Sequence, residues 1–130
     1  ADNIIGILDK RKVELLSKRL ILQPNSKEHK LRKYLYENGF EIHQELACSE
    51  GNHIYVIMRV EYKANPSVTP PPVFCYAGKV DKAHSDGRAY LKQVIKKLEI
   101  KYEAQRSSHS NEAQGVLLGQ LIAELSDYLK

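Results

Sequence analysis

The sequence contains no tryptophan, a single methionine and only two cysteines, Cys48 and Cys75. Neither cysteine has a second cysteine or a histidine at metal-ligand spacing, which argues against a zinc site and predicts two free thiols. Free thiols are typical of a reducing compartment, so we expect a cytoplasmic protein. The chain also lacks an apolar run that could span a membrane and a signal-peptide pattern, so no membrane association is expected.

Other chemistry-bearing patterns are missing as well. The five histidines are scattered without partners at ligand spacing, and we predict no metal site. The order of residues supports neither a Ser-His-Asp nor a Cys-His arrangement, so no catalytic residue can be named. The eight tyrosines are interpreted as core and interface residues, although Tyr55 or Tyr62, near a strand end, could stack on a base.

What is present is typical of one globular domain with an appendage. The 130 residues are 28% charged and 42% hydrophobic, and no internal repeat is visible. The net charge of +4 is compatible with a polyanionic partner but does not require one.

The run Arg-Leu-Ile-Leu-Gln at residues 19–23 predicts a short strand. Its consecutive apolar residues, Leu20 to Leu22, indicate burial on both faces, as in a parallel sheet. Pro24 cannot continue the hydrogen-bond ladder and ends the strand. Asn25 can cap the helix that follows, with Glu28 completing a pair that resembles a capping box.

The end of this strand is a candidate site. In open α/β sheets, ligands bind outside the carboxyl ends of the strands. Gln23, Pro24 and Asn25 occupy that position, although an ordinary strand-to-helix turn explains Pro24 and Asn25 equally well.

The following segments predict the end of a mixed sheet. A helix over residues 26–38 stops at Gly39, which suits the left-handed conformation after a helix. Residues 40–48 and 53–62 read as two strands of an antiparallel hairpin around the turn at 50–52. Together with an initial helix over about 2–16, these elements predict an α/β sheet that is parallel except for its last strand.

The remainder of the chain has a different character. Residues 64–72 hold four prolines and mark a domain boundary, followed by a short docking segment. From residue 86 the apolar period is helical, and a polar break at 107–111 offers Ser110 or Asn111 as the cap of a second helix. We therefore expect three parts: a sheet domain at 1–63, a linker and docking segment at 64–85, and an antiparallel coiled-coil hairpin at 86–130. The seam residues are Leu91, Ile95, Leu98, Tyr102 and Gln105 in the first helix and Leu118, Ile122, Leu125 and Leu129 in the second.

Three motifs carry a resemblance to a known family. They are RLILQPN, the helix end LRKYLYENGFEI and the hairpin EGNHIYVIM, followed by a helical pair. This combination resembles the second half of bacterial tRNA (adenine-22-N1)-methyltransferases, most closely over residues 19–62 and loosely over 86–130. The resemblance implies the fifth, sixth and antiparallel seventh strands of a Rossmann-like S-adenosylmethionine domain and a C-terminal helical appendage.

Two departures from the family pattern limit what this chain can do. The glycine-rich turn GMGG, which in the family precedes a helix similar to IIGIL, is absent, and so is the earlier glycine-rich cofactor loop. We therefore expect S-adenosylmethionine to be held by residues outside this chain and the chain alone to be inactive. Val56 also stands where the family usually has a glutamate after its tyrosine, here Tyr55.

The resemblance implies methylation of adenine N1 in a tRNA. An amide of Gln23 or Asn25 could pair with an adenine edge, and Pro24 could pack on the base face. Basic residues along two helices are candidates for phosphate contacts. They could equally form a solvated helix face, in which Glu99 and Glu103 pair with nearby lysines. The tRNA-binding candidates are Arg88, Lys92, Lys96, Lys97 and Lys101 on the later helix and Lys30 and Lys33, beside Lys27 and Arg32, on the earlier one.

The alternative function is a non-enzymatic α/β module whose hairpin mediates protein interaction or dimerisation. A sheet that ends at residues 19–23 exposes an apolar edge and apolar faces, so we expect either self-association, through this edge or the coiled coil, or marginal stability.

Overall fold

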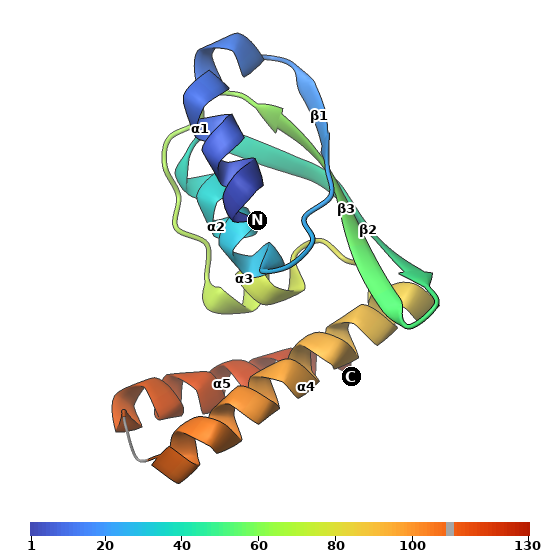
Figure 1. The fold of residues 1–130 in the computed structure, drawn as a ribbon, viewed down its shortest axis with the longest axis vertical. Helices are drawn as coiled ribbons and strands as arrows, with labels where there is room; N and C mark the ends of the chain where they lie inside the picture. Colours follow the sequence, from blue (N-terminus) through green and yellow to red (C-terminus); the bar gives the residue numbers. More distant parts are fainter. Residues whose placement is uncertain (109–110) are drawn as a thin grey trace.

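A computed structural model describes residues 1–108 and 111–130 of the chain. It places three strands and most of the helices in an α/β part, below which two long helices form a hairpin (Figure 1). Ser110, one of the two expected caps, lies outside the described residues. In chain order the elements are α1 (Asp2–Leu15), β1 (Arg19–Leu22), α2 (Glu28–Glu37), β2 (Phe40–Glu50), β3 (His53–Tyr62), α3 (Pro72–Ala77), α4 (Ser85–Ser108) and α5 (Glu112–Leu129).

The three strands form one sheet in the order β1-β3-β2. β3 is antiparallel to both neighbours, with Leu20 opposite Val60 on one side and Phe40 opposite Tyr62 on the other. β1 and β2 therefore run in the same direction, and the expected α/β class with an antiparallel last strand is confirmed. The expectation did not include the insertion of that last strand between the other two.

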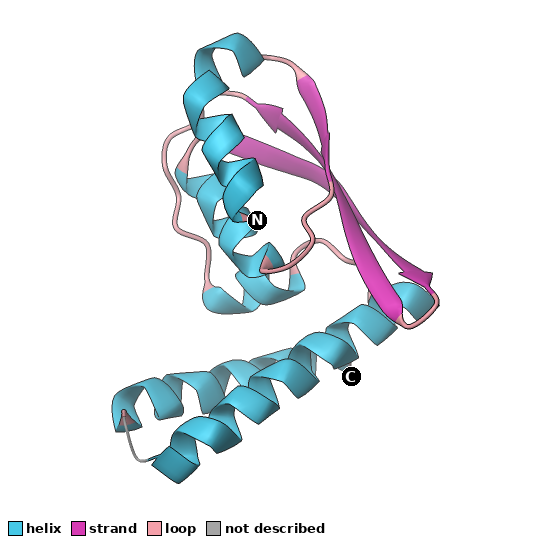
Figure 2. Ribbon diagram, in the orientation of Figure 1, coloured by secondary structure: helices cyan, strands magenta, loops and turns pink. Residues whose placement is uncertain are grey.

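One part of the strand prediction is wrong. β1 is one of the two outer strands of the sheet, and its residues alternate between exposed and half-buried rather than being buried on both faces. Ile21 is 67% exposed. The physical reason is that α1 and α2 lie on the same side of the sheet, so that the other face at β1 is uncovered (Figure 2).

The predicted start of the second helix is also wrong. α2 begins at Glu28, and the residue before it, Lys27, is left-handed with φ +56° and makes no side-chain cap. This turn separates Asn25 from the helix, so neither the Asn25 cap nor its pairing with Glu28 forms. The predicted stop is confirmed, because Gly39 follows α2 with φ +86°.

The sheet and the helical hairpin each have a buried face. The sheet packs Phe40, Ile42, Val56, Met58 and Val60 against Leu31 and Leu35 of α2. In the hairpin, α4 and α5 run antiparallel (Figure 1), and all the predicted seam residues are buried or half-buried. Asn111 caps α5 by accepting from the Gln114 amide at 3.1 Å, as expected. Whether the packing is that of a regular coiled coil stays a prediction.

The proline-rich segment between these parts is hydrogen-bonded to α2. The Val68 amide donates to the Tyr36 carbonyl at 3.1 Å, and Thr69 donates to Glu37 at 3.2 Å, so the segment lies along α2. α3 follows, with Pro72 in its first turn and Cys75 and Ala77 buried. Among the described residues, no helix has the length and apolar character needed to cross a membrane.

Candidate nucleic-acid interface

A groove of about 380 Å³ lies where the α/β part meets α4. Four segments line it: the turn before α2 with its first residues, the start of β3, α3, and the middle of α4. Its polar and aromatic lining residues include Asn25, His29, His53, Tyr76, Lys97 and Lys101. Its volume falls within the range of small-ligand sites in proteins.

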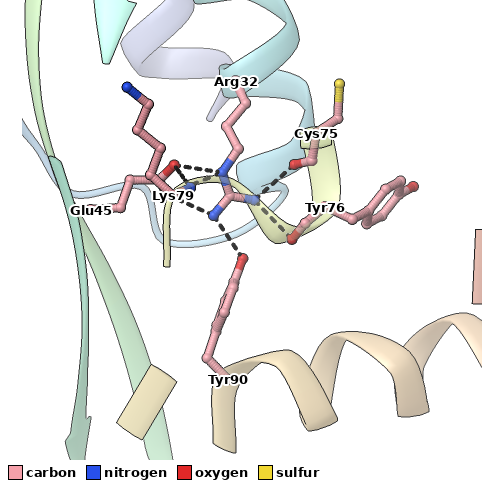
Figure 3. A network of polar contacts seen from close by, with 6 residues as sticks. All are labelled: Arg32, Glu45, Cys75, Tyr76, Lys79 and Tyr90. Carbon is pink, nitrogen blue, oxygen red and sulfur yellow. Dashed lines mark hydrogen bonds and ion pairs between the residues drawn. The ribbon is translucent and has the colours of Figure 1, made fainter. Parts of the chain in front are cut away.

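A buried polar network holds these segments together, and Figure 3 shows its geometry. Arg32 of α2 is fully buried and pairs with Glu45 of β2, with Nη2 and Oε1 2.8 Å apart and Nε 3.1 and 3.2 Å from the two carboxylate oxygens. The second Glu45 oxygen accepts from the Lys79 amide at 2.8 Å. Both oxygens of this buried carboxylate therefore accept hydrogen bonds within the network.

The same guanidinium reaches α3 and α4. Its Nη1 donates to the carbonyls of Cys75 and Tyr76, at 2.8 and 3.0 Å, and its Nη2 donates to the Tyr90 hydroxyl at 3.2 Å. One side chain thus ties α2, β2, α3 and α4 to each other (Figure 3). The network fixes the position of the hairpin relative to the sheet and forms one wall of the groove.

The protonation states in the network are well defined. Burial opposes the charge on Arg32, but Tyr90 and Glu45 outweigh it and raise the pKa of Arg32 above its usual value. Burial raises the pKa of Tyr90 to about 12, although Arg32 acts in the opposite direction. At physiological pH the guanidinium is therefore charged and the phenol is protonated.

Arg32 corrects one sequence-based expectation. It was grouped with Lys27, Lys30 and Lys33 as part of an exposed basic face, whereas its side chain is entirely inside the protein. The exposed residues of that group remain Lys27, Lys30 and Lys33, and only Lys27 lines the groove.

An aromatic pair lines the same groove as the lysines of α4. The rings of His29 and Tyr76 are stacked, with centroids 4.4 Å apart and planes 9° apart. Burial lowers the pKa of His29 below its usual value of 6.5; Glu28 opposes this shift, whereas Lys101 adds to it. The imidazole is therefore neutral at pH 7. Neither ring was singled out from the sequence, because Tyr76 lies in a segment without periodicity and His29 has no ligand-like neighbour.

The predicted basic cluster of α4 is divided by the structure. Lys97 and Lys101 line the groove, and in the described part of the chain no ion pair engages either of them. Arg88 instead donates to the Leu129 carbonyl at 2.8 Å and so holds the end of α5. Lys92 lies beside that same end, and Lys96 is exposed outside the groove.

The structure also separates the three candidate residues at the end of β1. Asn25 is exposed and lines the groove, whereas Pro24 is buried and Gln23 is exposed away from it. The structure therefore brings Asn25 together with Lys97 and Lys101, and separates these three residues from Gln23, Lys92 and Lys96.

In the described part of the chain, the turn after β1 is not the glycine-rich loop that would cradle S-adenosylmethionine. No glycine occurs between Gly6 and Gly39, where the turn after β1 lies. A Cβ at Gly39 would meet the Asn65 backbone at 3.1 Å, and one at Gly78 would meet Arg32, so these glycines serve protein packing rather than an open loop. In the described residues no cluster of three or more histidine, cysteine or acidic side chains could hold a metal ion.

The fold and the groove define a class: a mixed α/β sheet in the order β1-β3-β2 that carries a basic groove beside a helical hairpin. Residues 1–123 match the family described as tRNA (adenine(22)-N(1))-methyltransferase (TrmK), and the chain belongs to this family. No curated protein sequence matches the chain.

Solved structures share the fold. A Streptococcus agalactiae protein of the NADB-Rossmann superfamily is 22% identical, with a TM-score of 0.75 over 99% of this chain and 56% of its own. Streptococcus pneumoniae Sp1610, a putative tRNA (m1A22) methyltransferase, is 24% identical in its complex with S-adenosyl-L-methionine, with a TM-score of 0.72 over 99% of this chain and 56% of its own. The Bacillus subtilis m1A22 tRNA methyltransferase TrmK is 22% identical, with a TM-score of 0.65 over 97% and 55%. This chain therefore spans just over half the length of these proteins.

Proposed function

We propose that the chain is the C-terminal part of an S-adenosylmethionine-dependent enzyme that methylates N1 of an adenine in tRNA. The observation that carries the proposal is the groove, which places Asn25, at the end of β1, on the same surface as Lys97 and Lys101. An amide that can read a base edge and cations that can contact phosphates are the two elements that RNA positioning requires. Family membership supports tRNA as the partner.

The other half of the protein would bind the methyl donor. When bound, S-adenosylmethionine supplies an electrophilic methyl group, so this chain need only present the adenine in the correct orientation. The exposed edge of β1 is where we place the junction, because Ile21 is apolar and 67% exposed there. Residues 1–63 would complete the catalytic domain, 64–85 would connect, and 86–130 would bind tRNA. Because both cysteines are free thiols, we place the protein in the cytoplasm.

Replacing Asn25 with alanine is expected to lower methylation without affecting folding. The side chain is exposed and does not cap α2, so the free energy of unfolding should change by less than about 0.5 kcal/mol. Loss of paired hydrogen bonds to the base edge should reduce kcat/KM about tenfold or more. The measurement is methyl transfer from labelled S-adenosylmethionine to N1 of adenine in tRNA by the full-length protein, with urea unfolding in parallel. Equal loss of activity and stability would assign Asn25 a structural role.

Charge reversal in the groove is expected to weaken tRNA binding and its salt dependence. Each lost phosphate contact reduces the magnitude of the slope of log K against log salt by roughly 0.7–0.9, so Lys97→Glu with Lys101→Glu should reduce it by about 1–2 and weaken binding about tenfold or more. Lys92→Glu with Lys96→Glu is the matched control, because it changes the same charge on the same helix outside the groove. Titration of tRNA at several salt concentrations separates the two pairs.

Two results would contradict the proposal. If both charge-reversal pairs had the same effect, the groove would not be the tRNA surface. If the unmodified protein ignored tRNA and eluted as a stable dimer in size-exclusion chromatography, the non-enzymatic module would be the better description. Self-association would then use the edge of β1 or the hairpin.

A further inference from the structure

We propose that the groove holds one unpaired nucleotide of the RNA substrate, other than the adenine that is methylated, with its base stacked on the His29–Tyr76 pair and its phosphate against Lys97 and Lys101. This inference rests on the proposed function, because it assumes that the bound polyanion is RNA. It adds a second, base-binding subsite to a surface for which only phosphate contacts and Asn25 were predicted.

The aromatic pair has the geometry of a stacking platform. The two nearly parallel rings stack on each other with centroids 4.4 Å apart, so that each ring holds the other in position, and both are half-buried residues that line the groove. Single-stranded RNA is commonly recognised by bases that leave the helix and stack on tyrosine or histidine rings. A neutral imidazole beside a phenol ring presents a π surface without a competing charge.

Hydrogen bonds to the backbone of α3 hold Tyr76 in place. The backbone carbonyls of Cys75 and Tyr76 accept hydrogen bonds from the buried Arg32 guanidinium, at 2.8 and 3.0 Å. α3, which carries Tyr76, therefore cannot shift without breaking the network in Figure 3. A surface fixed in advance loses little conformational entropy when a base stacks on it.

The charges in the groove favour a nucleotide over an uncharged aromatic ligand. Lys27, Lys97 and Lys101 line it against the single unpaired carboxylate of Glu28, since the charge of Arg32 is already matched by Glu45. Cations beside an aromatic layer provide the two contacts that a nucleotide needs, one for phosphate and one for base. The volume of about 380 Å³ is within the range of small-ligand sites, which suits one nucleotide.

Two of the three residues predicted to contact the methylated adenine lie outside the groove. Gln23 and Pro24, at the end of β1, do not line it, whereas Asn25 does. We therefore place the methylated adenine on the β1 side of Asn25 and the stacked nucleotide on the α4 side.

The test is tRNA binding by the full-length protein with substitutions at Tyr76. Tyr76→Leu should weaken binding about tenfold, because stacking on one aromatic ring is lost, while Tyr76→Phe should bind as the unmodified protein does. Since no charge changes, the salt slope should remain that of the unmodified protein in both variants. His29→Leu should weaken binding similarly and serves as the second variant if Tyr76→Leu lowers the melting temperature.

The outcomes separate this inference from the proposed function. If the unmodified protein binds and methylates tRNA but Tyr76→Leu and His29→Leu bind as tightly, the stacked nucleotide is refuted and the proposed function stands. If Tyr76→Leu lowers the salt slope along with the affinity, the variant has displaced the lysines, and stacking is refuted as the cause. If the unmodified protein does not bind tRNA at all, both proposals fail.

Discussion

Replacing Arg32 with leucine is expected to lower the free energy of unfolding by about 3–5 kcal/mol, since removing one partner leaves a buried charge uncompensated. Glu45 would remain inside the protein, where only the Lys79 amide still donates to it. The carbonyls of Cys75 and Tyr76 would lose the guanidinium as their donor as well. Urea unfolding followed by circular dichroism should show a lower midpoint with little change in slope.

Lys33→Leu is the matched control for this substitution. Lys33 is the next residue of α2, is exposed, and receives the same side chain, so its effect should stay within about 0.5 kcal/mol. Comparable losses for the two variants would show that the guanidinium network contributes little to stability.

A double variant, Arg32→Leu with Glu45→Leu, distinguishes the ion pair from the wider network. Replacing both charges with apolar side chains often restores the stability lost with one of them. Here we expect only partial recovery, because the carbonyls of α3 and the Lys79 amide would still lack partners, at about 1–3 kcal/mol for each unsatisfied group. Complete recovery would mean that the backbone contacts of Arg32 are dispensable.

Local signals in the sequence predicted much of the fold. Gly39 ends α2 in the left-handed conformation, Asn111 caps α5, and the seam positions of α4 are buried or half-buried. Each of these features depends on residues within one or two helical turns, which is the range over which a sequence pattern is reliable.

Features that depend on distant contacts could not be predicted. Arg32 was assigned to an exposed face because its partners lie at positions 45, 75, 76 and 90, on three other elements. Ile21 was expected to be buried because a run of apolar residues does not reveal that one face of the sheet is uncovered at β1. Asn25 does not cap α2 because the backbone is left-handed at Lys27. A lysine rarely adopts this conformation, so nothing in the sequence predicted it there.

The candidate site shows the same division. The sequence made the end of β1 and the lysines on α4 candidates, and Asn25, Lys97 and Lys101 do share the groove. Their separation from Lys92 and Lys96 was not visible, because it depends on which side of α4 faces the sheet. Tyr76 and His29 meet only because α3 packs beside the start of α2.

Replacing Gly78 with alanine is expected to destabilise the protein by more than about 3 kcal/mol. Gly78 follows α3 with φ +59° and ψ −147°, a backbone conformation that costs other residues about 1–3 kcal/mol. In addition, a Cβ at this position would lie 2.3 Å from both Arg32 Nε and Glu45 Oε2. The methyl group would therefore push apart the ion pair itself, and these atoms cannot move away without losing the hydrogen bonds that keep them buried.

Gly115→Ala is expected to change the free energy of unfolding in the opposite direction and serves as the control. Gly115 lies inside α5, and a Cβ there would have no neighbour within 4 Å. Alanine should stabilise that helix by about 0.5–1 kcal/mol, because it loses less conformational freedom on folding. Urea unfolding of both variants should therefore give changes of opposite sign. A small loss for Gly78→Ala would show that α3 can move relative to β2, and with it the wall of the groove that Tyr76 forms.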